Sequence, residues 1–300
     1  MQGGVSTGHL HPELQGLAGW SAEDRIKFVT SDTWVSYPAA EDVLAKLTDL
    51  LTESPNQARR RGYLISARAD NGKTALLRQF QDMNPVTSPD TGETTMPVLL
   101  ISMPEKPSDA SFWSAVLQAL RAPHRVGDPS RVLRAQALET MRYLKVRMLV
   151  IDEIHNLLEG SAREQSAALV MLKMLSNELT IPLVAAGTKA ALQALMTDNQ
   201  LATRFKVAGL PPWRTNRSTR DFLFSMASVL PLMEPSGLAD PDLMQNVMLK
   251  AHETVDGIVF VLRETTKLAI RSGVERITTG LVKQVDSSNL TTMNIRDLEI

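Results

Sequence analysis

The sequence contains no cysteine and few aromatic residues, and each absence narrows the class of structure. Without cysteine the chain forms no disulfide and no thiolate metal site, which agrees with a reducing cytoplasm. Aromatic residues make up 5% of the chain, against 43% hydrophobic and 22% charged residues. This balance is typical of a globular domain, and the many Leu, Ala and Met residues predict an aliphatic, helix-rich core.

Long apolar runs and an excess of one charge are also missing. No run approaches the roughly 18 residues that a membrane-spanning helix needs, so no membrane partner is expected. The first 20 residues are polar and Gly-rich, which does not fit a secretory signal and predicts a flexible arm over residues 1–20. The formal net charge of -1 gives no overall attraction to nucleic acid, so a DNA site would have to be a local basic patch.

The most informative segment present is 67–74, which reads Ala-Arg-Ala-Asp-Asn-Gly-Lys-Thr. It lies between an apolar, strand-like run and a helix-like run, and it fits the phosphate-loop pattern of Gly, four residues, Gly, Lys and Ser or Thr, except that Ala67 replaces the first Gly. We expect Lys73 to reach the β and γ phosphates of a nucleoside triphosphate and the Thr74 hydroxyl to ligate Mg²⁺. Backbone N–H groups around Gly72 would complete the cradle, and the expected contributors are Ala69, Asp70, Asn71 and Ala75.

A second signal is the apolar run 148–151, which ends in Asp152 and Glu153. In open parallel sheets, ligands bind at the carboxyl ends of the strands, where these acids would emerge. We expect Asp152 to hold Mg²⁺ and Glu153 to polarise an attacking water. The Gly-Lys-Thr segment alone could be a turn or a helix cap, and the Asp152–Glu153 pair alone could cap the next helix. The two signals together, in this order, predict nucleotide binding.

Short apolar strands alternate with helical patterns up to about Trp213, and helical patterns dominate beyond it. This order predicts an α/β fold, with a parallel sheet flanked by helices and a smaller helical domain after it. The expected parts are a flexible arm at 1–20, a nucleotide-binding domain at 21–230, and a helical lid domain with a C-terminal tail at 231–300.

Two further residues have a functional and a structural interpretation. Thr188 follows the strand-like run 181–187, where its hydroxyl can contact the γ-phosphate or the lytic water, or simply cap the next helix. Arg204 lies near an expected domain edge, where it can neutralise charge on the γ-phosphate bound by a neighbouring subunit, or form a surface salt bridge.

At this point the sequence resembles the TniB/TnsC-type AAA+ ATPases of DNA transposition. The resemblance covers about residues 20–230. It is specific, because several motifs unrelated to ATP chemistry recur in order. It is carried by Gly-Lys-Thr at 72–74, Val-Ile-Asp-Glu-Ile-His-Asn at 150–156, Ile-Pro-Leu-Val-Ala-Ala-Gly-Thr at 181–188 and Asp-Asn-Gln-Leu-Ala-Thr-Arg-Phe at 198–205, with support from 34–39, 103–107 and 210–213.

The resemblance implies an AAA+ P-loop fold and a bacterial, cytoplasmic, DNA-associated ATPase that uses ATP and Mg²⁺. It implies self-assembly into rings or filaments on double-stranded DNA, marking of a target site, recruitment of a transposase with a TniQ-type targeting protein, and disassembly on hydrolysis. By the same resemblance Thr188 is the sensor, Arg204 acts on a neighbouring subunit's nucleotide, and Tyr37 and Pro38 lie beside the adenine.

Two positions depart from the family pattern. Ala67 adds a Cβ where the phosphate loop turns, which is tolerable at negative φ and costly at positive φ. The helical domain should supply a sensor arginine, and Arg263 offers the nearest match at an unusual spacing.

A DNA site on a near-neutral chain has to arise by repetition of a few cations along an assembly, and its contacts would read the backbone with little sequence specificity. Lys106 is the first such cation, and the helix that follows it ends in further ones. A solvated helix end, where cations complement the dipole, is the structural alternative. The expected DNA-binding residues are Lys106, Arg121, Arg125 and Arg131.

Two alternative functions are compatible with the same nucleotide-site residues. A nucleotide-dependent signalling switch would keep the nucleotide site without engaging DNA. A replication-loader type of ATPase shares the fold, but the helical pattern ends near residue 290 and is expected to leave no room for a winged-helix domain.

Overall fold

The structure is a computed structural model of the 300-residue chain. It describes residues 8–31, 33–53, 62–86, 94–125, 127–159, 162–178 and 181–287. The chain forms two compact units, one made of Ala39–Pro211 and the other of the two ends of the chain, up to Pro38 and from Pro212 onward. None of the described helices is both long and apolar enough to cross a membrane.

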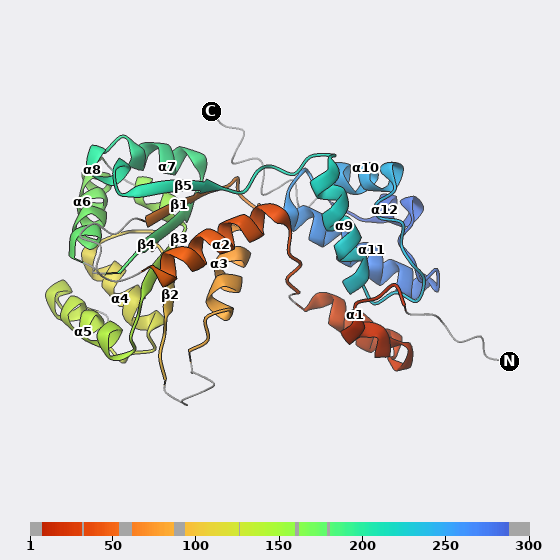
Figure 1. The fold of residues 1–300 in the computed structure, drawn as a ribbon, viewed down its shortest axis with the longest axis horizontal. Helices are drawn as coiled ribbons and strands as arrows, with labels where there is room; N and C mark the ends of the chain where they lie inside the picture. The colour runs from red at the N-terminus through yellow and green to blue at the C-terminus, as the bar shows by residue number, and fades with distance from the viewer. Residues whose placement is uncertain are drawn as a thin grey trace. The chain divides into compact units, whose positions relative to one another are not determined.

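The first unit is built on a five-stranded, all-parallel sheet in the order β2-β3-β4-β1-β5 (Figure 1). Every residue of β3 and β4 is buried, as expected for central strands covered on both faces. The strands are β1 (Gly62–Ser66), β2 (Val98–Ser102), β3 (Met148–Asp152), β4 (Leu183–Gly187) and β5 (Phe205–Gly209).

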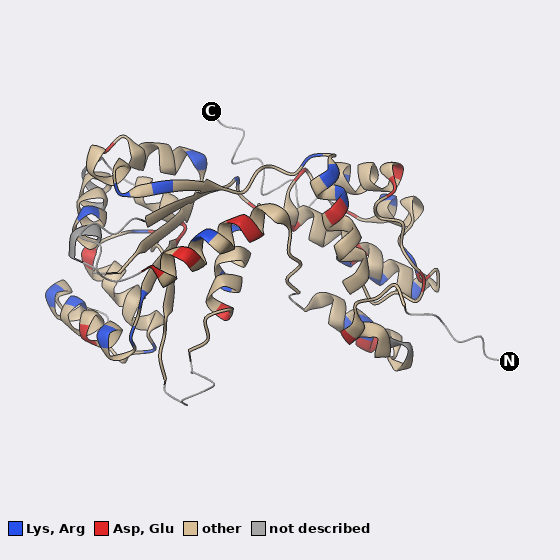
Figure 2. Ribbon diagram, in the orientation of Figure 1, with Lys and Arg blue, Asp and Glu red and all other residues tan. Residues whose placement is uncertain are grey.

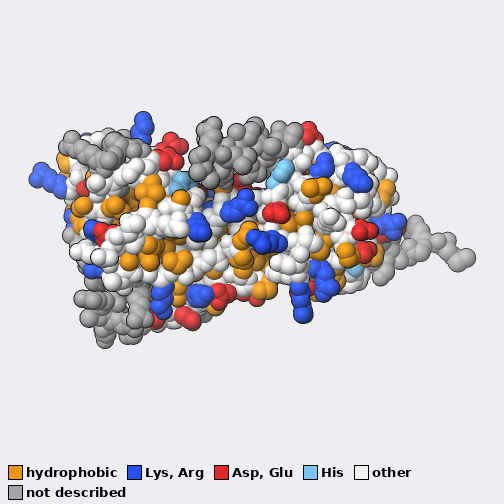
Figure 3. All heavy atoms as spheres, turned by 90° about the horizontal axis from the view of Figure 1, so that it is seen from above, with side chains coloured by type: hydrophobic (Ala, Val, Ile, Leu, Met, Phe, Trp, Pro, Cys, Tyr) orange, Lys and Arg blue, Asp and Glu red, His pale blue; other side chains and the backbone are white. Residues whose placement is uncertain are grey.

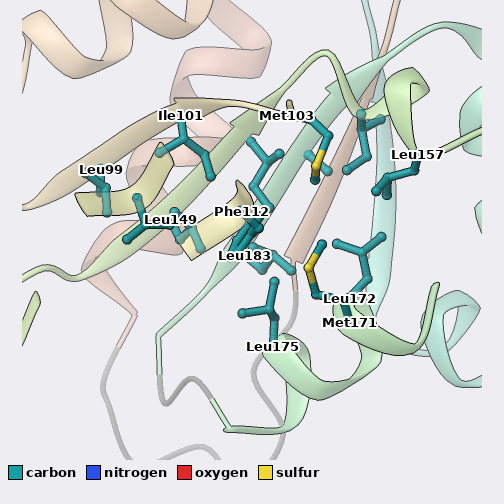
Figure 4. Close-up of a cluster of buried hydrophobic side chains, with 14 of the residues drawn as sticks. Leu99, Ile101, Met103, Phe112, Leu149, Leu157, Met171, Leu172, Leu175 and Leu183 are labelled. Carbon is teal, nitrogen blue, oxygen red and sulfur yellow. The ribbon is translucent and has the colours of Figure 1, made fainter. Parts of the chain in front are cut away.

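Helices flank this sheet and supply the rest of its core (Figure 4). On one side of β2 and β3, the side chains of Phe112, Leu149 and Leu175 meet in a single apolar cluster. The helices are α2 (Pro38–Thr52), α3 (Lys73–Asp82), α4 (Asp109–Ala119), α5 (Ser130–Tyr143), the 3-10 helix η2 (Ile154–Leu158), α6 (Ala162–Glu178), α7 (Lys189–Met196) and α8 (Asn199–Ala202).

The strand order places three segments with predicted functions side by side. β1 pairs with β4, and β4 pairs with β3, all in parallel register. The segments that leave the carboxyl ends of these strands therefore meet at one edge of the sheet. They are the phosphate loop after β1, the Asp152–Glu153 pair at the end of β3, and Thr188 after β4.

The second unit is helical, and α11 carries its most extensive buried face. The Arg25 side chain is buried and fixes α1 to the chain that follows α11, through Glu275. The helices are the 3-10 helix η1 (Pro12–Gly19), α1 (Ala22–Thr30), α9 (Arg217–Val229), α10 (Pro241–Lys250), α11 (Val255–Ser272) and α12 (Thr279–Gln284).

The parallel sheet flanked by helices confirms the predicted fold class. The N-terminal arm differs from expectation where it is described, because residues 8–20 are folded. Leu10 and Leu14 are buried there, and the His11 N–H donates to the Ser228 carbonyl of α9. Residues 1–7 of the expected arm, and the tail from 288, lie outside the described residues.

Candidate functional site

The loop between β1 and α3 has the shape of a phosphate cradle. Gly72 caps α3 with φ 75°, a left-handed conformation that glycine adopts without a Cβ penalty. Asp70 is also left-handed, at φ 54°. The Lys73 side chain is buried and folds back over the loop, where its Nζ donates to the Arg68 carbonyl at 2.8 Å. The loop thus presents the N-terminus of α3 and a lysine ammonium to the same small space.

Ala67, the departure from the phosphate-loop pattern, is accommodated without strain. Its φ is not in the left-handed region. The residue is buried, and its N–H donates to the Gly187 carbonyl of β4 at 3.3 Å. The added Cβ therefore packs in the sheet and does not distort the turn.

Asn71 makes a contact that the sequence pattern did not reveal. Its side chain is buried, and Nδ2 donates to the carbonyls of Leu210 (3.3 Å) and Pro211 (3.0 Å). These two carbonyls belong to the chain just after β5, so the phosphate loop is tied to the end of the unit. The only sequence signal was an amide side chain at a loop position where no amide is required.

Asp152 and Thr74 meet although 78 residues separate them. The Thr74 hydroxyl donates to Asp152 Oδ2 at 2.6 Å, and the Glu153 N–H donates to Asp152 Oδ1 at 2.8 Å. Asp152 is buried, as the end of a central strand must be. A hydroxyl and a carboxylate on adjacent segments fit Mg²⁺, which takes one or two protein oxygens and keeps water and phosphate oxygens as its other ligands. Among the described residues, no group of three or more His, Cys, Asp or Glu offers an all-protein metal cage.

Glu153 stands beside this pair in an unusual backbone conformation. Its φ is 54°, left-handed for a residue with a side chain, and it directly precedes the 3-10 helix η2. Its Oε2 lies 3.1 Å from His155 Nε2. The carboxylate is about one-third exposed, so it borders on solvent at the carboxyl edge of the sheet.

Thr188 and Arg204 lie at opposite ends of the parallel strands, Thr188 at the carboxyl ends and Arg204 at the amino ends. Thr188 follows β4 at the phosphate-loop edge, where its hydroxyl accepts from the Ala191 N–H at 3.3 Å and caps α7. Arg204 directly precedes β5, and its carbonyl accepts from the Gly62 N–H at the start of β1. A five-residue strand is about 16 Å long. The structure therefore brings Thr188 to the phosphate loop of its own subunit and places Arg204 at the other end of the strands.

Tyr37 and Pro38, expected beside the adenine, lie at the boundary of the helical unit. The Tyr37 ring is buried against Trp213 and Phe222, with centroids 4.9 Å and 5.7 Å away. Burial, followed by the charge of Asp256, raises the pKa of the Tyr37 hydroxyl to about 12. The adenine assignment stays a prediction.

Arg263, the suggested sensor arginine, lies on α11 in the helical unit. Its Nη2 donates to the Ser31 carbonyl at 2.7 Å, which links α11 to the end of α1. This contact is structural, and a nucleotide role for Arg263 stays a prediction.

The four expected DNA-binding cations are all exposed, but they form two groups. Arg121, Arg125 and Arg131 lie around the connection from α4 to α5, where Figure 2 shows Lys and Arg along α5. Lys106 lies before the other end of α4, about 16 Å of helix away. On the face drawn in Figure 3, basic and acidic side chains are interspersed, so no single-sign field dominates it.

The chain matches the model of a protein family described as bacterial TniB protein, over residues 25–215. A search of curated proteins found no match. Among solved structures, the Aeropyrum pernix ORC1 protein in complex with DNA is similar, with a TM-score of 0.66, 19% identity, and coverage of 90% of this chain and 70% of that one.

Two further structures are similar at the level of the fold. The Aeropyrum pernix ORC2 protein, solved as ADPNP-ADP complexes, has a TM-score of 0.57 and 15% identity, and covers 91% of this chain and 74% of that one. Cdc6p from Pyrobaculum aerophilum has a TM-score of 0.57 and 18% identity, with coverage of 85% and 68%. The sheet order and these neighbours agree on the AAA+ fold, and by its family match the chain belongs to the bacterial TniB proteins.

Proposed function

We propose that this protein is an Mg²⁺-dependent ATPase that assembles on double-stranded DNA and regulates transposition. The observation that carries the proposal is the hydrogen bond from Thr74 to Asp152, because it joins the phosphate loop to the acidic end of β3. Family membership and the fold support it, and so do the similar structures, one of which was solved in complex with DNA and another as ADPNP-ADP complexes.

In this proposal each residue at the carboxyl edge of the sheet has one task. Lys73, which here donates to the Arg68 carbonyl, would turn to the β and γ phosphates. Thr74 and Asp152 would hold Mg²⁺, which neutralises phosphate charge when bound. Glu153 would orient and polarise the attacking water, and Thr188 would sense the γ-phosphate.

Arg204 cannot reach the nucleotide of its own subunit in this geometry, since it precedes β5 at the amino ends of the strands. A neighbouring subunit whose phosphate-loop edge faces that end would receive it. Self-assembly is therefore part of the catalytic proposal, because the site is completed in trans.

DNA would bind through repeated backbone contacts from Lys106 and from the group Arg121, Arg125 and Arg131. A few cations per subunit suffice when subunits stack, and each phosphate contact adds affinity and salt dependence. Marking of a target site, recruitment of a transposase and a TniQ-type protein, and disassembly on hydrolysis complete the proposal, on the strength of family membership.

The test uses Glu153→Gln, which keeps the shape of the side chain but cannot polarise water. With ATP and duplex DNA we expect this variant to bind nucleotide, hydrolyse none, and accumulate as rings or filaments visible by negative-stain microscopy. A variant that stays monomeric under these conditions contradicts the assembly proposal, and one with wild-type hydrolysis contradicts the role of Glu153.

The DNA part is tested separately by charge reversal. Arg121→Glu with Arg125→Glu, and Lys106→Glu alone, should each weaken duplex binding and lower its salt dependence in fluorescence anisotropy. Arg217→Glu is the matched control, because that side chain is 87% exposed on α9 in the helical unit. Unchanged affinity in all the variants, without DNA-stimulated ATPase, would favour a nucleotide switch that does not engage DNA.

A further inference from the structure

His155 contacts the acid that the proposed reaction depends on. Its Nε2 lies 3.1 Å from Glu153 Oε2, and its Nδ1 is buried with no hydrogen-bond partner among the described residues.

The backbone that carries His155 is held firmly against the sheet. Ile154, its neighbour in η2, is fully buried, and a Cβ added to Gly187 at the end of β4 would come within 2.6 Å of the Ile154 Cγ2. On the other side, Asn156 Nδ2 donates to the Met103 carbonyl at 2.8 Å. His155 is thus flanked by two anchored residues, which limits where its ring can go.

The two ring nitrogens have different surroundings, and this fixes their roles. A proton on Nδ1 would be a buried donor without an acceptor, which costs more than a buried lone pair. A proton on Nε2 points at a carboxylate oxygen, the stronger kind of hydrogen bond. The arrangement therefore favours the tautomer in which His155 donates to Glu153.

We propose that His155 is a positioning residue that holds the Glu153 carboxylate toward the attacking water. The hydrogen bond uses one carboxylate oxygen and leaves the other to accept from water. Glu153 has a left-handed backbone and a partly exposed side chain, so without His155 its carboxylate would sample several rotamers. This inference rests on the proposed function, which assigns the water to Glu153.

The test compares three substitutions of His155 in the full-length protein. His155→Phe keeps the ring and loses the donor, and His155→Asn keeps a polar group too short to reach Glu153. His155→Gln places an amide N–H near the position of Nε2. Steady-state ATPase rates with duplex DNA, over a range of ATP concentrations, separate kcat from KM.

We expect kcat to fall about tenfold in His155→Phe and His155→Asn, with KM for ATP within twofold of wild type, because alignment is lost while binding is kept. His155→Gln should recover to within about threefold of the wild-type rate. If His155→Phe does not fold, as judged by circular dichroism, His155→Asn carries the comparison.

Three results would overturn the inference. They are a kcat unchanged in both His155→Phe and His155→Asn, a kcat raised in both, which would mean that His155 restrains Glu153, and a failure of His155→Gln to recover. Glu153→Gln is measured alongside to separate the two proposals. Wild-type hydrolysis in Glu153→Gln refutes the role that the proposed function gives to Glu153, whereas loss in Glu153→Gln with no effect at His155 refutes the positioning role alone.

Discussion

At the scale of single residues, Ala67 shows how the phosphate loop departs from its pattern without losing its shape. The left-handed turns of the loop fall on Asp70 and Gly72, not on Ala67. The Ala67 side chain is buried where β1 meets β4. A glycine at this position is therefore not required by the backbone.

Restoring the usual glycine should weaken the fold. Ala67→Gly removes a buried methyl group and adds freedom to the unfolded chain, so we expect the free energy of unfolding to fall by about 1 kcal/mol. Urea unfolding followed by circular dichroism measures it. Asp70→Gly is the opposite case, because its φ of 54° suits glycine, and we expect little loss or a small gain there. Equal losses in both variants would contradict this account of the loop.

The residues whose place in the fold the sequence predicted are those set by a local pattern. Gly72, Lys73 and Thr74 follow a strand and open a helix, as the pattern requires, and Asp152 ends a buried strand. The amide link from Asn71 could not be predicted, because its partners lie 139 and 140 positions away. Nothing in the neighbouring residues encodes such a contact.

At the scale of elements, an ion pair between a buried arginine and a half-buried glutamate links the N-terminal and C-terminal parts of the helical unit. Arg25 of α1 donates to both oxygens of Glu275, at 2.6 Å and 2.8 Å, and to the Pro231 carbonyl at 3.0 Å. α1 lies near the start of the described chain and α11 near its end. The pair joins residues 250 positions apart, so no local pattern could assign the N-terminal helices to the C-terminal unit.

Acid should destabilise the helical unit through this pair. Burial alone would raise the pKa of the Glu275 carboxyl, but the hydrogen bonds and charge of Arg25, with the Met233 N–H, outweigh it and lower the pKa. The stabilisation is therefore complete above the ordinary Glu pKa of about 4.3 and is lost as the pH falls through the lower, folded-state value. Thermal unfolding between pH 3 and 7, followed by circular dichroism, should show this loss on the acid side.

The variant Glu275→Gln isolates the pair. It leaves the Arg25 charge buried and uncompensated, so we expect a loss of roughly 3 kcal/mol at pH 7 and a flatter acid slope. Glu234→Gln is the matched control in the same unit, because its pair with Arg276 is exposed and contributes little. An acid slope as steep in Glu275→Gln as in wild type would assign the pH dependence to other groups.

At the scale of the whole molecule, the chain passes between its two units twice, at Pro38–Ala39 and at Pro211–Pro212. The second passage comes directly after Leu210 and Pro211, whose carbonyls accept hydrogen bonds from the Asn71 side chain. We therefore expect a nucleotide that reshapes the phosphate loop to act on the residues that lead into the helical unit. Motion between units joined in this way is the default expectation for domains.

The absence of cysteine makes that motion measurable. Tyr143→Cys and Leu249→Cys introduce two labelling sites, one in each unit, at side chains that are 81% and 77% exposed. Double electron–electron resonance on the doubly labelled protein should show a distance distribution that changes when a non-hydrolysable ATP analogue is added. Fluorescence titration with a labelled nucleotide establishes saturation in each variant.

Asn71→Ala in that labelled background should shrink the nucleotide-dependent change, measured at saturating nucleotide so that weaker binding cannot explain it. The substitution removes the hydrogen bonds from the loop to the carbonyls of Leu210 and Pro211. A movement of the loop would then no longer displace the connection at Pro211–Pro212. Asn246→Ala is the matched control, since it removes an asparagine whose amide bonds only within α10, to the Asp242 carbonyl. If Asn71→Ala responds as fully as Asn246→Ala does, the link is a local brace of the loop, and the signal must reach the helical unit by the first passage at Pro38.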